Sequence, residues 1–261
     1  MIAQHIINPL NNDYHQLETW SAAAGLAEAT ERIELIGAVK PFFFHPAILA
    51  KIALGIDEIS HGQFSINLIS GWYMPEMEQA GLIIRAHNDR YRFSRKWLRI
   101  VKALWGDENV SFDGDYFRIK ELHFHPGPIA RPHPRVYLGG ESEPARALAA
   151  DEADVYLING RPIELIREIV ADLRRRPRRN VRPLRFGTAG SRARELLEAE
   201  SADFIVVIYS SPGWNRTWAS SFSVNIKARS WRVAGSWCQI LTSPFRCARS
   251  CRNIIRPDTA R

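Results

Sequence analysis

Only three cysteines occur in the 261 residues, at Cys238, Cys247 and Cys251. They form no CxxC pair, and no histidine follows His133. A structural zinc site normally needs four cysteine or histidine ligands at short spacings. We therefore expect no metal site.

Long apolar stretches are also lacking, because no run of about 18 apolar residues occurs anywhere. The N-terminus "MIAQHIINPLNND" lacks the basic, apolar and small-residue succession of a secretory signal. We expect a cytoplasmic protein without a membrane segment. The 46% share of hydrophobic residues is enough for a core in one large domain or two smaller ones.

An excess of positive charge is lacking except at one end of the chain. The formal net charge is +7, but residues 1–190 carry 24 basic against 23 acidic residues, whereas residues 191–261 carry 11 against 5. Only this tail, with four of the eight tryptophans, supports a nucleic-acid-binding hypothesis. We predict a domain over 1–190 and a divergent tail over 191–261. The tail is either poorly ordered or an out-of-frame translation of a GC-rich gene, and the abrupt change favours the second.

Up to residue 190, predicted strands alternate with predicted helices, which is typical of a parallel sheet. The glycine-rich GxGxxG signature of dinucleotide binding does not follow the first strand. A doubly wound sheet and part of a (β/α)8 barrel both fit. Strands are predicted at 32–39, 63–71, 134–140, 154–160 and 183–187. Helices are predicted at 13–28 with Asp13 as cap, 46–60, 92–105, 142–153 and 162–176. A hairpin is predicted at 110–119, with its turn at Asp113-Gly114.

An asparagine interrupts the apolar strand "QFSINLISG". Alternation places Phe64, Ile66 and Leu68 on one face and Asn67 on the other. In a parallel barrel the inner face can display polar groups near the carboxyl-terminal mouth, where active sites lie. Asn67 is then either a ligand-facing amide or a buried amide satisfied by neighbouring backbone.

The motif "GGES", residues 139–142, links a predicted strand to a predicted helix. Free amides at the helix start, with the Ser142 hydroxyl, could bind a phosphate. Alternatively, Ser142 only caps its helix and the glycines only make a turn. The negative charges of Glu143 and of the glutamate in the motif count against a bound anion. The positive charges of Arg90 and Arg146 could offset them.

Several segments together resemble the bacterial luciferase-like, reduced-flavin-dependent monooxygenases, and most resemble the enzymes that attack alkanesulfonates and dimethyl sulfone. The segments are "INLISGWYMPEMEQAG", "HNDRYRFSRKWL" with "KALW", "FDGDYFRI", and "VYLGGESEPARALA" with "DVYLING". The similarity spans about residues 8–190. It implies an α/β fold, a TIM-type (β/α)8 barrel that holds FMN at the carboxyl ends of its strands.

The resemblance also implies the roles of six residues. Asn67 and Glu76 would bind the flavin ring or ribityl chain, and the remaining four would lie at the phosphate: Arg90, Tyr91, Gly140 and Ser142. No residue matches a catalytic acid or base of the family. His45 is the nearest histidine to the mouth, and we expect it to pack or to cap a helix.

The implied activity is insertion of one oxygen atom from O2 into a small organosulfur substrate, an alkanesulfonate or a sulfone. A separate NAD(P)H-dependent flavin reductase would supply FMNH2, and a complete barrel would form a homo-oligomer. Two alternatives stay open besides nucleic-acid binding. One is a catalytically inactive flavin-binding fragment, and the other is a deazaflavin (F420)-dependent oxidoreductase of the same superfamily.

Two departures from the family pattern bear on the fold. The first two strands and the helix between them are missing, and the seventh strand begins at "LRFGTAG" before the similarity ends. We therefore expect an incomplete barrel of about strands 3 to 7, which exposes parallel edges that closure would protect.

Overall fold

The computed structural model describes residues 1–9, 13, 17–71, 73–106, 109–158, 161–180, 182–188 and 204–205. The predictions for the tail therefore lie outside the described residues, apart from Phe204 and Ile205. The division at residue 190 stays a prediction.

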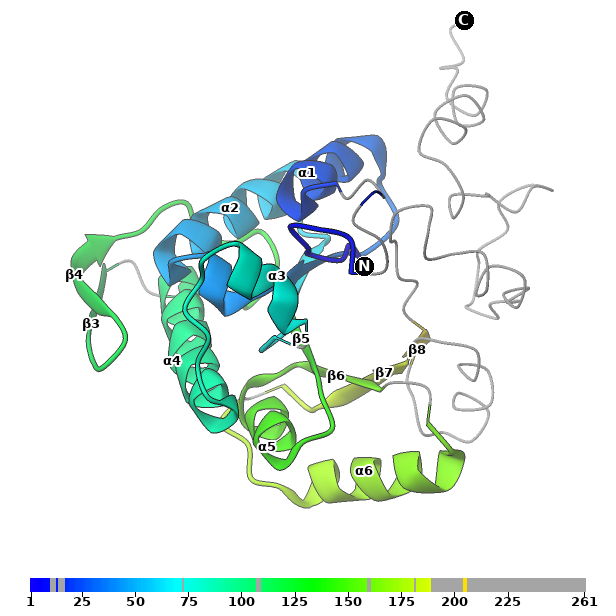
Figure 1. Ribbon diagram of the computed structural model, residues 1–261. Helices are drawn as coiled ribbons and strands as arrows, with labels where there is room; N and C mark the ends of the chain where they lie inside the picture. Colours follow the sequence, from blue (N-terminus) through cyan, green and yellow to red (C-terminus); the bar gives the residue numbers. More distant parts are fainter. Residues whose placement is uncertain are drawn as a thin grey trace, which may run out of the picture.

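Six parallel strands form one curved sheet in the order β1-β2-β5-β6-β7-β8 (Figure 1). Within the described residues β1 and β8 do not pair, so the barrel is not closed. The predicted incomplete α/β barrel and its five strands are confirmed. The strands are β1 Leu35–Val39, β2 Phe64–Leu68, β5 Arg135–Gly139, β6 Val155–Ile158, β7 Arg185–Thr188 and β8 Phe204–Ile205.

The first residues of the chain extend the sheet at the β1 edge. Ile2 N donates to Ile36 O at 2.7 Å, and Ala38 N donates to Ile2 O at 2.9 Å. These bonds make a parallel bridge between Ile2 and Gly37. The segment therefore covers part of an edge that would otherwise present unpaired amides.

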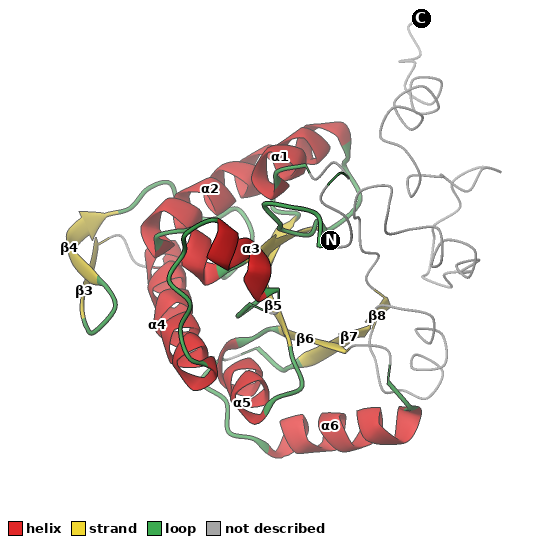
Figure 2. Cartoon of the chain, viewed as in Figure 1, coloured by secondary structure: helices red, strands yellow, loops and turns green. Residues whose placement is uncertain are grey.

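Helices lie along the outer face of the sheet (Figure 2). All five predicted helices are present, although their ends differ from the prediction by up to six residues. A sixth, α3, and a short 3₁₀ turn η1 were not predicted. The bounds are α1 Thr19–Ala29, η1 Pro41–Phe43, α2 Pro46–Ile59, α3 Met74–Gln79, α4 His87–Gly106, α5 Glu143–Glu152 and α6 Ile163–Arg175.

The cap of α1 differs from the prediction. The Glu18 carboxylate accepts hydrogen bonds from Trp20 N at 2.9 Å and Ser21 N at 2.7 Å. Asp13 lies six residues before the helix begins, so the prediction that it caps α1 was wrong. A carboxylate next to the first turn satisfies the free amides directly.

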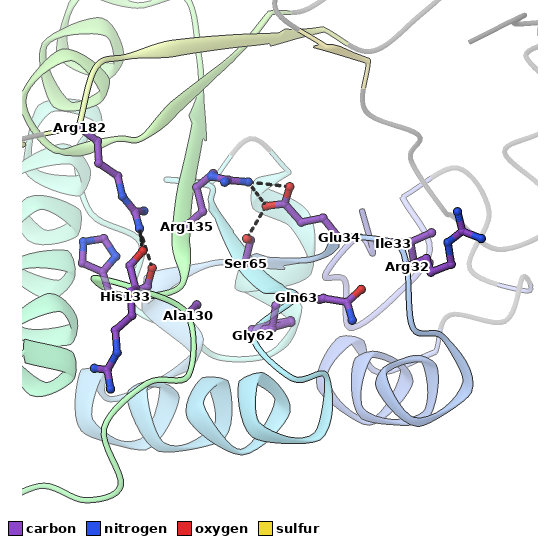
Figure 3. A pocket seen from close by; sticks show the side chains of 12 residues that line it. Arg32, Ile33, Glu34, Gly62, Gln63, Ser65, Ala130, His133, Arg135 and Arg182 are labelled. Atoms are coloured by element: carbon purple, nitrogen blue, oxygen red, sulfur yellow. Dashed lines mark hydrogen bonds and ion pairs between the residues drawn. The ribbon is translucent and has the colours of Figure 1, made fainter. Parts of the chain in front are cut away.

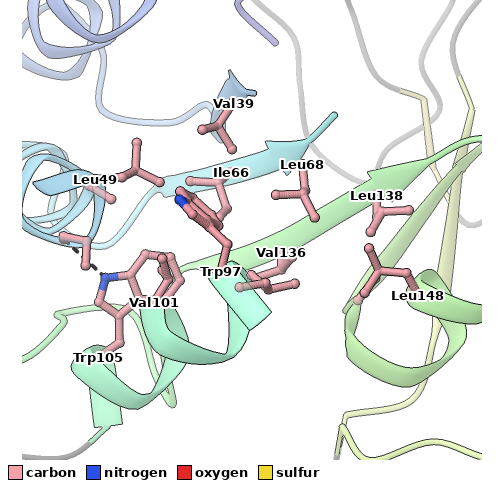
Figure 4. Close-up of a cluster of buried hydrophobic side chains, with 14 of the residues drawn as sticks. Val39, Leu49, Ile66, Leu68, Trp97, Val101, Trp105, Val136, Leu138 and Leu148 are labelled. Carbon is pink, nitrogen blue, oxygen red and sulfur yellow. Dashed lines mark hydrogen bonds between the residues drawn. The ribbon is translucent and has the colours of Figure 1, made fainter. Parts of the chain in front are cut away.

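The main core fills the space between the sheet and α2, α4 and α5 (Figure 4). Phe64, Ile66 and Leu68 all point into it, as strand alternation predicts. At its centre Trp97 is 0% exposed, and its Nε1 donates to Phe44 O at 2.8 Å. The opposite face of β2 is thereby left to Ser65 and Asn67.

The predicted hairpin is confirmed as β3 Asn109–Asp113 and β4 Arg118–His123, between α4 and β5. Gly114 N donates to Phe117 O at 3.1 Å across the turn. In Figure 1 the hairpin projects away from the sheet. It is thus an insertion in the alternation of strands and helices.

Basic side chains of α4 pair with acidic ones of α5. Arg99 contacts Glu152 at 2.6 Å and Asp151 at 3.0 Å, and Lys102 contacts Glu152 at 3.4 Å. These charges hold two helices together and do not form a free basic surface. Among the described helices, none is both long and apolar enough to cross a bilayer.

Candidate functional site

Asn67 lies near the carboxyl end of β2, in register with Ala38 of β1 and Tyr137 of β5. Its side chain is on the face away from the main core, and the residue is 5% exposed. Nδ2 donates to Met1 Sδ at 3.1 Å, a weak acceptor. Oδ1 has no hydrogen-bond partner within the described part of the chain. The alternative that neighbouring backbone groups satisfy the Asn67 amide is therefore not supported. The buried Oδ1 is left as an acceptor for a ligand.

Glu76 lies in α3, which the chain enters through Gly71 at a φ of +86°. The residue is 1% exposed, and its Oε1 accepts from Lys40 Nζ. Its Oε2 accepts from Ile6 N at 3.1 Å and lies 3.2 Å from His5 Nδ1. Partners within the protein thus contact both carboxylate oxygens, and direct contact with a flavin stays a prediction.

Lys40 and His5 were missed by sequence reasoning. Lys40 directly follows β1 and is fully buried, with Nζ 2.8 Å from Gln4 O and 3.2 Å from His5 Nδ1. Burial lowers the pKa of Lys40, although its hydrogen bond to Glu76 opposes this. A lysine at the carboxyl end of a wholly apolar strand, "LIGAVK", was the signal available.

The turn between β5 and α5 contains Gly140 at a φ of +126°, which favours glycine. A methyl group added there would lie 2.8 Å from Ala145 Cβ and 3.5 Å from Tyr91 Oη. Tyr156 Oη donates to Gly140 O at 2.7 Å, and burial raises the pKa of Tyr156 to about 12. The carbonyl of Gly140 is therefore fixed by a hydroxyl that keeps its proton.

Ser142 occupies the cap position of α5, with extended backbone, yet its side chain makes no capping bond. Its Oγ is buried without a hydrogen-bond partner in the described residues. Capping alone therefore does not explain this serine. A free hydroxyl beside the free amides of a ten-residue helix is suited to an anion.

The two glutamates beside Ser142 are neutralised by arginines. Arg161 contacts Glu141 through two bonds of 2.8 and 2.9 Å, and Arg176 contacts Glu143 through bonds of 2.7 and 2.6 Å. The pKa of Glu143 is lowered by its hydrogen bonds to Arg176. The objection that these carboxylates would repel an anion is therefore weakened.

Arg90 and Tyr91 lie in the first turns of α4. Arg90 Nη1 donates to Met74 Sδ at 3.1 Å, and its Nε is buried without a partner in the region described. Tyr91 stacks at a tilt on His87, with ring centroids 5.1 Å apart. The buried Ser70–Ser94 hydroxyl contact of 3.0 Å ties α4 to the loop after β2.

The structure thus brings Tyr91 close to Gly140, two residues before Ser142, and links Arg90 through Met74 to the helix of Glu76. No contact joins Asn67 to Ser142 in the described part of the chain. Three of the six predicted residues, Tyr91, Gly140 and Ser142, therefore gather around one turn, whereas Arg90 contacts Met74. The Ser142 hydroxyl without a partner in the described residues and the helix amides fit a phosphorylated ligand there.

His45 lies outside this group. Its Nδ1 accepts a hydrogen bond from Ala47 N at 3.3 Å and so caps α2, as expected.

A pocket of about 350 Å³ opens at the opposite, amino-terminal end of the strands (Figure 3). Arg135 contacts Glu34 there through two bonds of 2.8 Å, and Arg182 contacts His133 O at 3.3 Å. None of the six predicted residues lines it. The pocket is therefore separate from the candidate site.

His133 in this pocket predicts a pH effect on stability. Burial lowers the pKa of His133, and its bond to Pro134 O at 2.8 Å and nearby Asp154 only partly oppose this. As pH falls below about 6.5, the unfolded chain takes up a proton before the folded chain does, and stability is lost. In urea denaturation from pH 7.5 to 5.5, His133→Gln should be less acid-sensitive than wild type. An unchanged pH slope would contradict this.

The sequence pattern of the luciferase-like monooxygenases matches residues 1–201. An FMNH2-dependent dimethylsulfone monooxygenase of Pseudomonas putida is 34% identical over 173 residues, which make up 66% of this chain and 48% of that protein. A protein of the same name from Pseudomonas fluorescens is 32% identical over 172 residues, 66% and 47% of the two chains. The chain spans about half the length of the curated relatives it matches.

Solved structures agree on the fold. An EDTA monooxygenase from Chelativorans sp. BNC1 superposes with a TM-score of 0.60 at 19% identity, over 72% of this chain and 52% of that one. An F420-dependent secondary alcohol dehydrogenase superposes with a TM-score of 0.58 at 15% identity, over 68% and 56%. Because the family pattern covers most of the sequence, the chain belongs to the luciferase-like monooxygenase family.

Proposed function

We propose that the chain binds reduced FMN and forms part of a monooxygenase that acts on a small organosulfur compound, with dimethyl sulfone as the first substrate to test. The observation that most supports this proposal is the Ser142 hydroxyl at the start of α5, which is buried and has no partner in the described residues. The names of the relatives support the flavin and the sulfone.

In this proposal Ser142 and the α5 amides hold the phosphate, while Arg90 supplies positive charge and Tyr91 a hydroxyl. Gly140 lets the backbone approach the ligand closely, because any larger residue would meet Ala145. Asn67 Oδ1 accepts a hydrogen bond from the polar part of the flavin, and Glu76 helps to form the wall beside it. These residues bind and orient the ligand, and no acid or base is assigned among them.

Bound reduced FMN would supply the reaction with O2 and the transfer of one oxygen atom. The protein's share is to hold the ligand and exclude water. The proposal includes a separate NAD(P)H-dependent flavin reductase, a cytoplasmic location and a homo-oligomer of the complete barrel. It also keeps the domain division at residue 190.

Titration with photoreduced FMN under anaerobic conditions tests the site. Ser142→Ala and Asn67→Ala should each weaken binding by about 1–3 kcal/mol, because each removes one buried hydrogen bond to the ligand. Flavin fluorescence measures the affinity. Ser60→Ala is the matched control, since Ser60 is a buried serine whose Oγ bonds Asp57 O at the far end of α2. Unchanged affinity in both site variants would refute the assignment.

Two alternatives are separated by the same titration. The structural likeness to an F420-dependent enzyme favours a deazaflavin as second candidate, and tighter binding of reduced F420 than of FMN would support it. Tight FMN binding without oxygen uptake on addition of dimethyl sulfone or methanesulfonate would instead support an inactive flavin-binding fragment.

A further inference from the structure

A buried cluster of charged and polar side chains lies beside the candidate site, and the ligand roles do not explain it. It joins His5 of the N-terminal segment, Lys40 after β1 and Glu76 of α3. Lys40 is 0% and Glu76 is 1% exposed. Burial of two opposite charges is tolerated only where the partners satisfy each other closely.

The hydrogen bonds of the cluster can be assigned. Lys40 Nζ has three hydrogens and three neighbours: Gln4 O at 2.8 Å, His5 Nδ1 at 3.2 Å and Glu76 Oε1. His5 Nδ1 cannot both accept from Lys40 and donate to Glu76 Oε2, 3.2 Å away. If it accepts, every ammonium hydrogen is used, and Ile6 N still supplies a donor to Oε2 at 3.1 Å. We therefore assign the histidine hydrogen to Nε2.

The cluster is connected to the candidate site in two directions. On one side, Met74 of the same short helix as Glu76 accepts from Arg90 at 3.1 Å. On the other side, Gln4 Oε1 accepts from Lys40 N at 2.6 Å, and Met1 of the same segment accepts from Asn67. A shift of the cluster would therefore move neighbours of both predicted ligand residues.

We propose that His5, Lys40 and Glu76 act as one charge-compensated positioning unit, which fixes α3 and the N-terminal segment against the carboxyl end of β1 and so sets the shape of the candidate flavin site. The part that concerns flavin rests on the proposed function. The part that concerns the unit itself rests only on the contacts above.

The directions in which the pKa values of Lys40 and Glu76 shift agree with this geometry. Burial lowers the pKa of Lys40 and is opposed by Glu76. Burial would raise the pKa of Glu76, but the contacts with His5 and Lys40 outweigh it, so the pKa is lowered. Glu76 is thus held in its ionic form by its partners, and its contact with Lys40 offsets part of the cost of burying the ammonium. The aromatic rings that face the cluster are Phe43, over which Lys40 Nζ lies at 5.2 Å, and Tyr73, which is 6.3 Å from His5.

A double-mutant cycle tests the unit in the full chain. Lys40→Met and Glu76→Gln should each lower the urea midpoint, because each leaves a buried group without its partner. The double variant should be more stable than the sum of the two single losses predicts. The matched control is the exposed pair Asp113–Arg118, at 2.9 Å with side chains 76% and 81% exposed. Asp113→Asn and Arg118→Met should combine additively.

Flavin affinity tests the positioning role. Lys40 and His5 have no predicted flavin contact, yet Lys40→Met and His5→Leu should each weaken FMN binding on the order of tenfold through displacement of ligand residues. His5→Asn, which can still offer an acceptor to Lys40, should restore most of the affinity. The hairpin control variants should bind as wild type does.

The outcomes separate the two claims. If the single variants fail to fold and the double variant folds, the unit is supported. If the losses of the two single variants simply add in the double variant, or the double variant does not fold, the unit is refuted, even where FMN still binds. If wild type does not bind FMN, the proposed function fails, and the denaturation cycle still decides on the unit. The denaturation cycle could show coupling between Lys40 and Glu76 while Lys40→Met and His5→Leu leave the FMN affinity unchanged. That result would overturn the positioning role.

Discussion

Replacing Trp97 with alanine is expected to lower the free energy of unfolding by about 3–5 kcal/mol. The indole is 0% exposed at the centre of the main core, between the sheet and helix α4. Its removal leaves a cavity that the rigid strands cannot close, and Phe44 O loses its bond from Nε1. Urea denaturation, followed by circular dichroism, measures the change.

Two variants make this result interpretable. Trp97→Phe keeps most of the apolar volume but not the hydrogen bond, so its loss should be clearly smaller than that of the alanine variant. Ile83→Ala removes a side chain that is 75% exposed and should change stability by less than about 0.5 kcal/mol. A loss below about 1 kcal/mol for Trp97→Ala would mean that the core is not organised around this residue.

The second large effect is expected for Gly140→Ala. The new Cβ would lie 2.8 Å from Ala145 Cβ, at a φ of +126° that side chains rarely adopt. Backbone strain and overpacking together should cost about 2–4 kcal/mol. FMN affinity should also fall, because the turn that presents Ser142 must shift. Denaturation and flavin titration measure the two effects separately.

Gly55→Ala is the matched control for this substitution. Gly55 lies within α2, and no heavy atom lies within 4 Å of an added Cβ. Alanine should therefore stabilise the helix there by about 0.5–1 kcal/mol. Equal effects of the two substitutions would show that neither strain nor contact at Gly140 matters.

Local patterns were sufficient to predict the alternating elements of the fold. The alternation of apolar and polar side chains in "FSINL" and the helical spacing of apolar residues around Trp97 are properties of neighbouring residues, and both are present in the structure. The open barrel followed from the resemblance. Helix α3 was missed, because a six-residue helix is too short for a periodic pattern.

The candidate site was predictable only in part. The strand-to-helix turn at Gly140 and Ser142 is a local motif, so its geometry could be inferred from the sequence. The partners of Glu76 could not, because Lys40 and His5 are 36 and 71 positions away and share no pattern with it. Likewise, the sequence did not show that Arg161 and Arg176 neutralise the glutamates beside Ser142.

Those two arginine–glutamate pairs determine how a phosphate could be attracted to α5. With the two glutamates compensated, the attraction in the proposed site comes from amide dipoles, a hydroxyl and the single charge of Arg90, all acting over a few ångströms. Dissolved ions weaken forces between exposed charges beyond about 8 Å at 0.15 M ionic strength, but hardly affect such short contacts. Adding sodium chloride should therefore change the capture of a phosphorylated ligand far less than it would at a cluster of unpaired arginines.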